Sequence, residues 1–451
     1  MKESVKVLYV SSRGDIGGGG ENYLLTLFNN IDKNRFKPIV VLPNDGSLRQ
    51  PLEALGVEVL VIEANYGWLQ PDAAWYKTIE GAQSRVNEYI SLIQNHKIDL
   101  IHTNSNLRFE GAMAAQITGT PHLYLAHIEY QPEMPIFQRV PLHLPSFAQL
   151  MDMLSDHTAA VSWSVANTLA SHISNGAIEV IHNGLELRQF DDALAVEPNA
   201  FRTELGLTAD DILITAAGRI SPDKGFDYFV EAAKRVSELK PDHIHFAIAG
   251  DPENTVHATL LNELVQKHDL SDRFHFLGFR KDIGSILAGS DIFVLSSRKE
   301  GHPYIMLEAM ASKCAVVACN CAGVEETIED GVSGFIVPLG DTDLLAERID
   351  GLIDSRELRD RMADAARTRI ESSFTADRTA NKLMECYDRL VSLTAKPPGS
   401  IGIELFLQNC AELGRLGNRS IELEHRLSQL ERNPFSRLCQ FAKQLFGNKP
   451  S

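Results

Sequence analysis

Apolar runs of strand length alternate along this chain with longer stretches in which apolar residues recur every three or four positions. The runs Val5–Ser11 and Ile212–Ala217 predict buried β-strands, and the stretch Phe226–Leu239 predicts an amphipathic helix. Residues 178–181 and 275–277 predict two further strands. The loops after such strands matter most, because open parallel sheets bind ligands at the carboxyl ends of their strands.

A carboxylate lies within a strongly apolar stretch, residues 298–311. Burying an unpaired carboxylate is costly, so Glu308 needs a partner. Pro303 suits the first position of a helix, which puts Glu300 in the preceding loop and Glu308 about 8 Å further along the axis. Carboxylates accept hydrogen bonds from sugar hydroxyls, and the free amides of a helix N-terminus suit a phosphate. The stretch indicates a nucleotide-sugar site; the alternative is a solvated Glu300 with Glu308 in a core salt bridge.

Two cations follow the predicted strand Ile212–Ala217, in the loop from Gly218 to Gly225. Arg219 offers a planar fork of donors and Lys224 a point charge, and together they would clamp a diphosphate at the strand's carboxyl end. The alternative is an ordinary basic surface loop.

Three motifs in this order resemble the pattern of retaining glycosyltransferases of family 4. They are Gly218-Arg219…Lys224-Gly225, Glu300 through Glu308, and Gly323-Val324-Glu325-Glu326…Asp330-Gly331…Gly334. The resemblance covers nearly all of residues 1 to 395. It implies an α/β protein of the GT-B architecture, in which two Rossmann-like, doubly wound domains face a cleft.

The resemblance also implies roles for individual residues. Arg219 and Lys224 would hold the donor diphosphate, Glu308 the ribose hydroxyls and Glu300 the hydroxyls of the transferred sugar. Phe279 and Arg280, which follow the predicted strand 275–277, would border the nucleotide base.

A run of four glycines and a glutamate, residues 17–21, follows the first predicted strand and leads into a helix expected to begin near Asn22. Glycine permits close backbone approach to a ligand. The run lacks the third glycine of a dinucleotide fingerprint and the Gly-Lys-Ser/Thr of a P-loop. The resemblance implies that Gly18 and Gly19 face the donor phosphates, whereas a simple tight turn is the alternative.

His127 closes an apolar segment and is therefore expected at the same edge of the first domain. It would donate to a phosphate or a sugar hydroxyl, and the resembled family has a histidine near this point that contacts the donor sugar. A structural histidine is the alternative. His102 follows a similar segment, residues 98–101, and has no assigned role.

Two departures from the family pattern stand out. His302 and Pro303 replace the Phe-Gly of the common Glu-Gly-Phe-Gly, and proline removes a backbone donor. Glu325 stands where proline is common. These changes leave the cation pair and the two glutamates in place.

Composition fits a soluble protein with two cores: the chain has 451 residues, of which 44% are hydrophobic. A net charge of -17 argues against nucleic-acid binding, and six scattered cysteines fit a reducing compartment. The first residues lack the apolar segment of a signal peptide. We therefore expect a cytoplasmic protein, with possible peripheral contact at the inner membrane face.

The Asp341-Thr-Asp343 string resembles the paired acids of metal-dependent glycosyltransferases, but it directly precedes a helical pattern. Asp341 is therefore predicted to cap that helix. We expect no cofactor and no essential metal.

The predicted organisation is an acceptor-side domain (1–190), a nucleotide-sugar-binding domain (198–375), a helix returning to the first domain (376–395), and a helical tail (401–451) after a Pro-Pro-Gly linker. In the tail, leucines follow an alternating three/four register that Ser420 interrupts, which predicts a short coiled coil or a helix packed on the body. They are Leu413, Leu416, Leu423, Leu427 and Leu430. After Pro434 an apolar stripe beside basic residues suits a membrane interface or a protein partner.

The predicted function is retaining, metal-independent transfer of a sugar from a nucleoside diphosphate sugar to a hydroxyl acceptor, in glycan, polysaccharide or glycolipid synthesis. The resemblance implies front-face transfer, in which the donor phosphate takes the acceptor proton. Two alternatives remain: a nucleotide-sugar epimerase of the same fold, and a non-catalytic sugar-binding scaffold.

Overall fold

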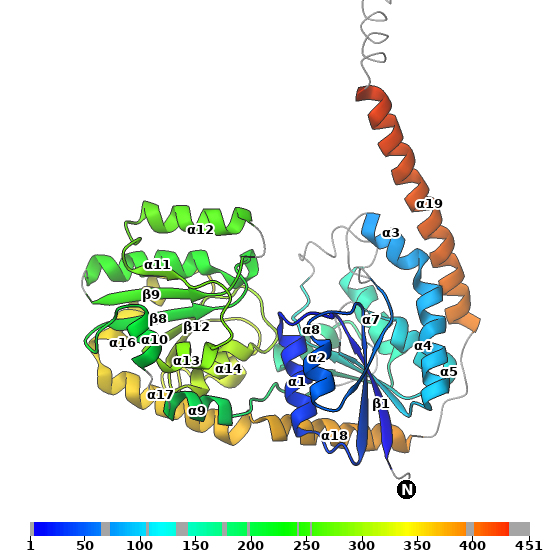
Figure 1. Ribbon diagram of the computed structural model, residues 1–451, viewed down its shortest axis with the longest axis horizontal. Coiled ribbons are helices and arrows are strands. Elements are labelled where there is room, and N and C mark those ends of the chain that lie inside the picture. Colours follow the sequence, from blue (N-terminus) through cyan, green and yellow to red (C-terminus); the bar gives the residue numbers. More distant parts are fainter. Residues whose placement is uncertain are drawn as a thin grey trace, which may run out of the picture.

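Two parallel β-sheets, each covered by helices on both faces, make up the body of the protein (Figure 1). The computed structural model describes residues 4–64, 73–104, 108–131, 143–173, 178–195, 199–240, 243–252, 255–393 and 401–432. The prediction of an α/β protein with two doubly wound parallel sheets is confirmed.

The first sheet has seven strands in the order β3-β2-β1-β4-β5-β6-β7. Its strands are β1 (Val5–Ser11), β2 (Phe36–Leu42), β3 (Glu58–Val61), β4 (Leu100–Asn104), β5 (His122–Ala126), β6 (His157–Ala160) and β7 (Glu179–Val180). The helices of this half are α1 (Gly19–Asn30), α2 (Arg49–Ala54), α3 (Ala73–Glu80), α4 (Ala82–His96), α5 (Glu110–Thr118), α7 (Leu144–Leu154) and α8 (Trp163–Ala170). The order reverses between β1 and β4, where such sheets open a ligand crevice.

The second sheet has six strands in the order β10-β9-β8-β11-β12-β13. Its strands are β8 (Ile212–Ala217), β9 (Ile244–Ala249), β10 (Phe274–Phe276), β11 (Ile292–Leu295), β12 (Ala315–Cys319) and β13 (Phe335–Val337). Its order reverses between β8 and β11. The two predicted motifs with Arg219 and Glu300 leave the sheet at this switch point, since they follow β8 and β11.

Helices of very different lengths surround the second sheet (Figure 1). They are α9 (Arg188–Ala195), α10 (Asn199–Glu204), the 3-10 turn η1 (Pro222–Lys224), α11 (Phe226–Leu239), α12 (Thr255–Lys267), α13 (Ile283–Ala288), α14 (Tyr304–Ala311), α15 (Val324–Thr327), α16 (Thr342–Asp354) and α17 (Arg356–Ser373). Strands β8 and β12 are buried along most or all of their length, which explains their continuous apolar sequence.

The chain crosses between the two halves twice, and the two crossings run side by side. Leu185 N donates to Phe374 O and Ala376 N donates to Leu185 O, both at 2.9 Å. Helix α18 (Ala376–Ser392) then packs under the first sheet, where Tyr387 and His102 are joined at 2.5 Å. Helix α18 therefore lies against α1 and β4 of the first half, after the chain has left the second.

The tail forms one long helix, α19 (Ile401–Arg432), whose first half lies along α3 and α4 (Figure 1). Leu407 is fully buried and Cys410 is 8% exposed, so they join the core of the first half. The linker before α19 and the stripe after Pro434 fall outside the described residues. None of the helices in the described part of the chain combines the length and apolar character needed to cross a membrane.

Several predicted elements have the expected bounds, namely β1, β8 and α11. Others differ by a few residues. Helix α1 begins at Gly19, three residues before Asn22, and Pro303 is the N-cap of α14 rather than its first residue. His102 lies inside β4, in the core, instead of following the strand.

Candidate active site

The loops at the carboxyl ends of the two sheets touch each other. Glu129 N donates to Glu300 O at 3.1 Å, across the interface between the halves. Gly301 lies so close to the strand-end loop of β5 that a Cβ on it would come within 2.0 Å of His127 O. Only glycine fits there, so the loop that carries Glu300 is held directly against His127.

Lys224 and Glu300 form an ion pair within the second half. Lys224 Nζ lies 2.5 Å from Glu300 Oε1, with the two side chains 24% and 12% exposed. Gly225 allows this placement, since it takes φ +60° and a Cβ there would meet Ser296 O at 2.1 Å. The predicted diphosphate cation and the predicted sugar carboxylate are thus brought together by the loops after β8 and β11.

Glu308 projects from α14 and is half-buried. Within the part of the chain that the structure describes, no hydrogen bond or salt bridge to its carboxylate is found. Burial raises the pKa of Glu308 to about 7. The neighbouring Tyr304 hydroxyl is buried without a partner among the described residues. The alternative, a core salt bridge, is therefore not found among the described residues, and the carboxylate is suited to accept hydrogen bonds from a ligand.

The glycine run lies opposite the start of α14. Gly19 is the first residue of α1, and a Cβ on it would lie 3.6 Å from the Tyr304 ring. Gly18 is the N-cap of α1, and a Cβ there would lie 2.8 Å from Glu21 Oε2. The glycine run thus lies on the side of the first half that faces the start of α14.

Glu21 was not among the predicted site residues, yet it is 3% exposed and its Oε2 has no hydrogen-bond partner among the described residues. Burial raises the pKa of Glu21, and the positive charges of Arg13 and Arg219 partly offset that rise. Arg219 therefore acts across the interface on a carboxylate of the first half. The sequence signal was available, since an acid directly follows the glycines.

His127 is fixed by Asn104, the last residue of β4. Its Nε2 lies 2.5 Å from Asn104 Oδ1, while Asn104 Nδ2 donates to Gly20 O at 3.0 Å. Because the amide oxygen only accepts, His127 Nε2 carries the proton. Burial lowers the pKa of His127 to about 3, which keeps the ring neutral. The proton on Nε2 is therefore directed at Asn104, and contact of His127 with a ligand stays a prediction.

A further cation, Arg298, braces the loop that carries Lys224. Its guanidinium forms two bonds to Asp227, at 2.8 and 2.5 Å, and lies 4.0 Å above the Tyr228 ring. Arg298 N also donates to Asp223 O at 2.7 Å. Sequence reasoning missed this brace because the pairing joins loops about 70 residues apart.

The loop predicted to border the base carries one exposed and one anchored side chain. Phe279 is 57% exposed, and its backbone N–H donates to Asp251 Oδ1 at 2.9 Å. Arg280 is bound by Glu204 and Asp282 and lies 5.5 Å from the Phe201 ring centre. Contact of either side chain with a base stays a prediction.

His302 turns away from the site and joins the two halves. Its Nδ1 accepts from Asn183 N at 3.1 Å, and its Nε2 donates to Thr327 Oγ1 at 2.9 Å. Glu326 lies beside it and accepts from the first backbone amides of α8, those of Trp163 and Ser164. Of the departures from the family pattern, His302 therefore lies at the junction between the halves, whereas Glu325 is exposed and accepts from Asn320 Nδ2 at 2.7 Å.

The Asp341-x-Asp343 string has the predicted capping role. Asp341 is the N-cap of α16, and its Oδ1 accepts from Leu344 N at 2.9 Å. Asp343 is paired with Arg235 on the protein surface.

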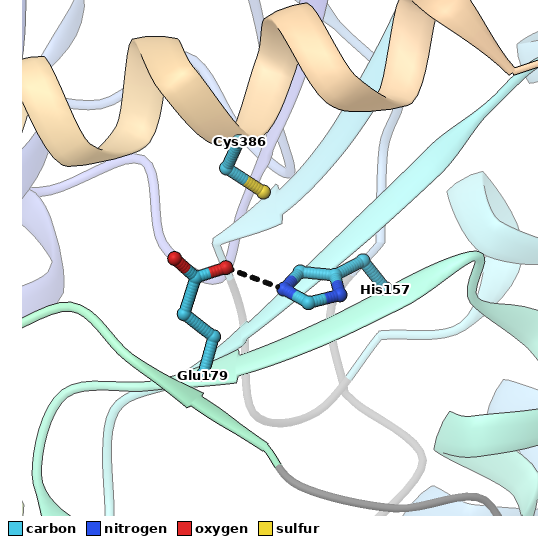
Figure 2. A group of neighbouring side chains, drawn as sticks. All are labelled: His157, Glu179 and Cys386. Carbon is cyan, nitrogen blue, oxygen red and sulfur yellow. Dashed lines mark hydrogen bonds and ion pairs between the residues drawn. The ribbon is translucent and has the colours of Figure 1, made fainter.

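One group of possible metal ligands occurs among the described residues: His157, Glu179 and Cys386, with ligand atoms within 4.8 Å of one another. Figure 2 shows His157 Nε2 bonded to Glu179 Oε2, at 2.8 Å, below α18. Arg389 donates to the same oxygen, and burial raises the pKa of the Cys386 thiol to about 12. The Glu179 carboxylate is already shared by the Arg389 guanidinium and the His157 imidazole. The cluster is therefore better suited to anchoring α18 to β6 and β7 than to binding a metal cation.

Two family models match this chain. Residues 199–369 match glycosyl transferases group 1, and residues 17–189 match glycosyltransferase family 4. The chain is 30% identical over 247 residues to the lipopolysaccharide core biosynthesis mannosyltransferase LpcC of Rhizobium leguminosarum bv. viciae, covering 52% of this chain and 68% of that protein. It is 28% identical over 326 residues to the UDP-Gal:alpha-D-GlcNAc-diphosphoundecaprenol alpha-1,3-galactosyltransferase of Escherichia coli, covering 69% and 81%.

The fold resembles the crystal structure of Anabaena Alr3699/HepE in complex with UDP and glucose, with a TM-score of 0.73 and 23% identity, covering 86% of this chain and all of that one. The fold and the matched motifs define a glycosyltransferase of the GT-B architecture. This chain belongs to glycosyltransferase family 4.

Proposed function

We propose that this glycosyltransferase moves a sugar from a nucleoside diphosphate sugar to a hydroxyl acceptor with retention of configuration and without a metal ion. One observation carries the proposal: three features lie together at the interface between the halves. They are the Lys224–Glu300 ion pair, the carboxylate of Glu308, which has no partner among the described residues, and His127, which is held by Asn104. Each matches one part of such a donor: diphosphate, ribose and transferred sugar.

The diphosphate would lie between Arg219, Lys224 and the start of α14. The first amides of a helix lack intrahelical partners and the helix dipole favours an anion there. These donors are fixed before the reaction, so they stabilise charge that grows on the leaving diphosphate. With two cations supplied by the protein, we expect that charge to be neutralised without a metal ion.

Glu300 and His127 would orient the transferred sugar, since the Glu300 carboxylate accepts hydrogen bonds and the loop that carries it lies against the backbone of His127. Glu308 would accept from the ribose hydroxyls. As the resemblance to family 4 implies, the donor phosphate would take the acceptor proton on the same face that the diphosphate leaves.

Uridine diphosphate sugars are the first donors to test. The relative from Escherichia coli is named for UDP-Gal, and the Anabaena structure contains UDP. A thermal-shift panel of UDP-, GDP- and ADP-sugars should show stabilisation that grows with the logarithm of ligand concentration over affinity. A folded protein that none of these donors stabilises at saturating concentration would contradict the donor site.

The reaction itself is tested by following nucleoside diphosphate release together with acceptor consumption, in excess chelator. Transfer predicts both, with the product anomer matching the donor anomer. Conversion of the donor into an isomer would favour an epimerase, and stable donor binding without turnover on any acceptor would favour a scaffold.

A further inference from the structure

Helix α19 has a docked face and an exposed face. On the docked face Leu407 and Cys410 are buried against the first half, and a Cβ on Gly417 would lie 2.0 Å from the Tyr76 ring. Asn418 donates to Glu80 near the end of this contact. Beyond it, Figure 1 shows the helix projecting away from the body.

The exposed face carries large apolar side chains. They are Phe406, Leu413, Leu416 and Leu423, each between 39% and 57% exposed. At about 100° per residue, this face lies roughly 120° around the helix from the docked one. A second helix can therefore approach it from a side that the body leaves open.

The spacing of this face is that of a coiled-coil seam. With Leu413 at position a of a heptad, the a and d positions run without a break from Phe406 to Leu430, and only Asn409 and Ser420 are polar among them. Position a holds Phe406, Leu413, Ser420 and Leu427, and position d holds Asn409, Leu416, Leu423 and Leu430. The docked face uses other positions, so one helix serves both contacts.

The charges beside the seam select the partner and its direction. Arg419 and Arg426 occupy g positions, and Glu424 and Glu431 occupy the following e positions. In a parallel pair in register, each g position faces the partner's next e position, so both arginines meet a glutamate. An antiparallel pair would set arginine near arginine and glutamate near glutamate, which is repulsive.

We propose that α19 is a parallel coiled coil that joins two copies of this chain, with the seam at Leu413, Leu416 and Leu423. Docking of residues 401–418 on the body already forms the helix, so dimerisation does not bear the cost of helix nucleation. This inference is independent of the donor and acceptor of the reaction.

The first test measures the mass of the full chain in solution by light scattering after gel filtration. The wild type should give twice 49.9 kDa, and the double variant Leu416→Glu with Leu423→Glu should give 49.9 kDa. Replacing the polar seam residue, Ser420→Leu, should tighten the dimer at least tenfold. A matched control, Gln408→Glu with Arg415→Glu, changes charge at c positions and should stay dimeric.

The second test concerns direction and charge. Arg419→Glu with Arg426→Glu should weaken the dimer, as should Glu424→Arg with Glu431→Arg, while a mixture of the two variants should form heterodimers. Leu413→Cys, in a Cys439→Ser background, should form an interchain disulfide on mild oxidation, because parallel helices set this position against itself. A wild type that stays at 49.9 kDa at its highest soluble concentration, even with Ser420→Leu, would overturn the proposal. The proposal would also be overturned if Leu416→Glu with Leu423→Glu stayed dimeric, or if Leu413→Cys formed no interchain crosslink in a proven dimer.

Discussion

Glu300 and Glu308 lie on one short stretch of chain but have opposite electrostatic surroundings. Glu300 is neutralised by Lys224 at 2.5 Å, whereas Glu308 is half-buried and has no partner among the described residues. Burial without a counter-charge raises the pKa of Glu308 to about 7. The two carboxylates are therefore expected to answer differently to pH and to mutation.

Glu308→Gln should stabilise the free protein above pH 7. The pKa of Glu308 is higher in the folded than in the unfolded chain, so the native carboxylate costs stability as pH rises through its usual value of 4.5 to about 7. At about 1.4 kcal/mol per pKa unit, the variant should gain on the order of 3 kcal/mol at pH 8 and little at pH 4. Chemical denaturation at the two pH values measures this difference.

The same carboxylate should make donor binding depend on pH. Because only the ionised form accepts from both ribose hydroxyls, donor affinity of the wild type should fall as pH drops below 7. The Glu308→Gln variant should bind more weakly and with a flat profile. A wild-type profile that is flat between pH 6 and 8 would speak against this role.

Arg219→Ala and Lys224→Ala should each lower kcat by a factor on the order of 10² or more, because each cation is expected to stabilise charge that grows on the leaving diphosphate. Lys313→Ala is a suitable control, since Lys313 forms an exposed ion pair with Asp364 and takes no part in the proposed site. Steady-state kinetics with a UDP-sugar would measure the effect. Wild-type turnover in both cation variants would rule out the clamp.

At the scale of elements, α18 and α19 attach to the first half by different means. Helix α18 is held by polar contacts, in which Glu179 joins His157 and Arg389, and by the buried Tyr387. Helix α19 is attached by the close approach of its backbone to α3, which Gly414 and Gly417 permit because they have no side chain. The Pro-Pro-Gly segment that composition predicts as a linker is therefore followed by a helix that packs on the first half.

Gly417→Val should undock the first half of α19, because the added side chain would overlap the Tyr76 ring. We expect a loss of about 1 to 3 kcal/mol in unfolding free energy and a change in fluorescence from the neighbouring Trp75. Gly402→Val is the control, since a Cβ at Gly402 would have no other atom within 4 Å. Identical fluorescence and stability in the two variants would contradict the docking.

At the scale of the whole molecule, the two halves meet through paired chain crossings, polar contacts and an apolar cluster to which both contribute. The polar contacts include those of Asn183, His302 and Glu326 and the backbone bond of Glu129 to Glu300, and the backbone bridge between Leu185 and Thr375 holds the crossings together. Such a junction fixes the distance between the donor loops and His127.

Gly184→Val should disturb that junction, because a Cβ at this position would lie 2.3 Å from Thr375 O. Neither crossing can move without breaking the backbone bonds at Leu185. We expect a lower melting temperature and, in small-angle scattering, a larger radius of gyration. Gly351→Val, at an open position on α16, should leave both unchanged.

The sequence by itself determined the elements and the residue types of the site. Strands β1 and β8 and helix α11 could be predicted because each is defined by local periodicity, and Asp341 because a cap needs only its own helix. The segments with Arg219, Lys224, Glu300 and Glu308 could be recognised because each motif lies in a short stretch of chain.

Only the tertiary structure decided which of these groups meet. The Lys224–Glu300 pair and the bond between His127 and Asn104 each join segments far apart in sequence. The contact of His302 with Asn183 and the burial of Glu21 depend on packing between the halves. Pattern and spacing carry no information about such contacts. They depend on the strand order, which groups the carboxyl ends of β1, β4 and β5 in one sheet and those of β8 and β11 in the other, and on the contact that sets the loops of the two groups against each other.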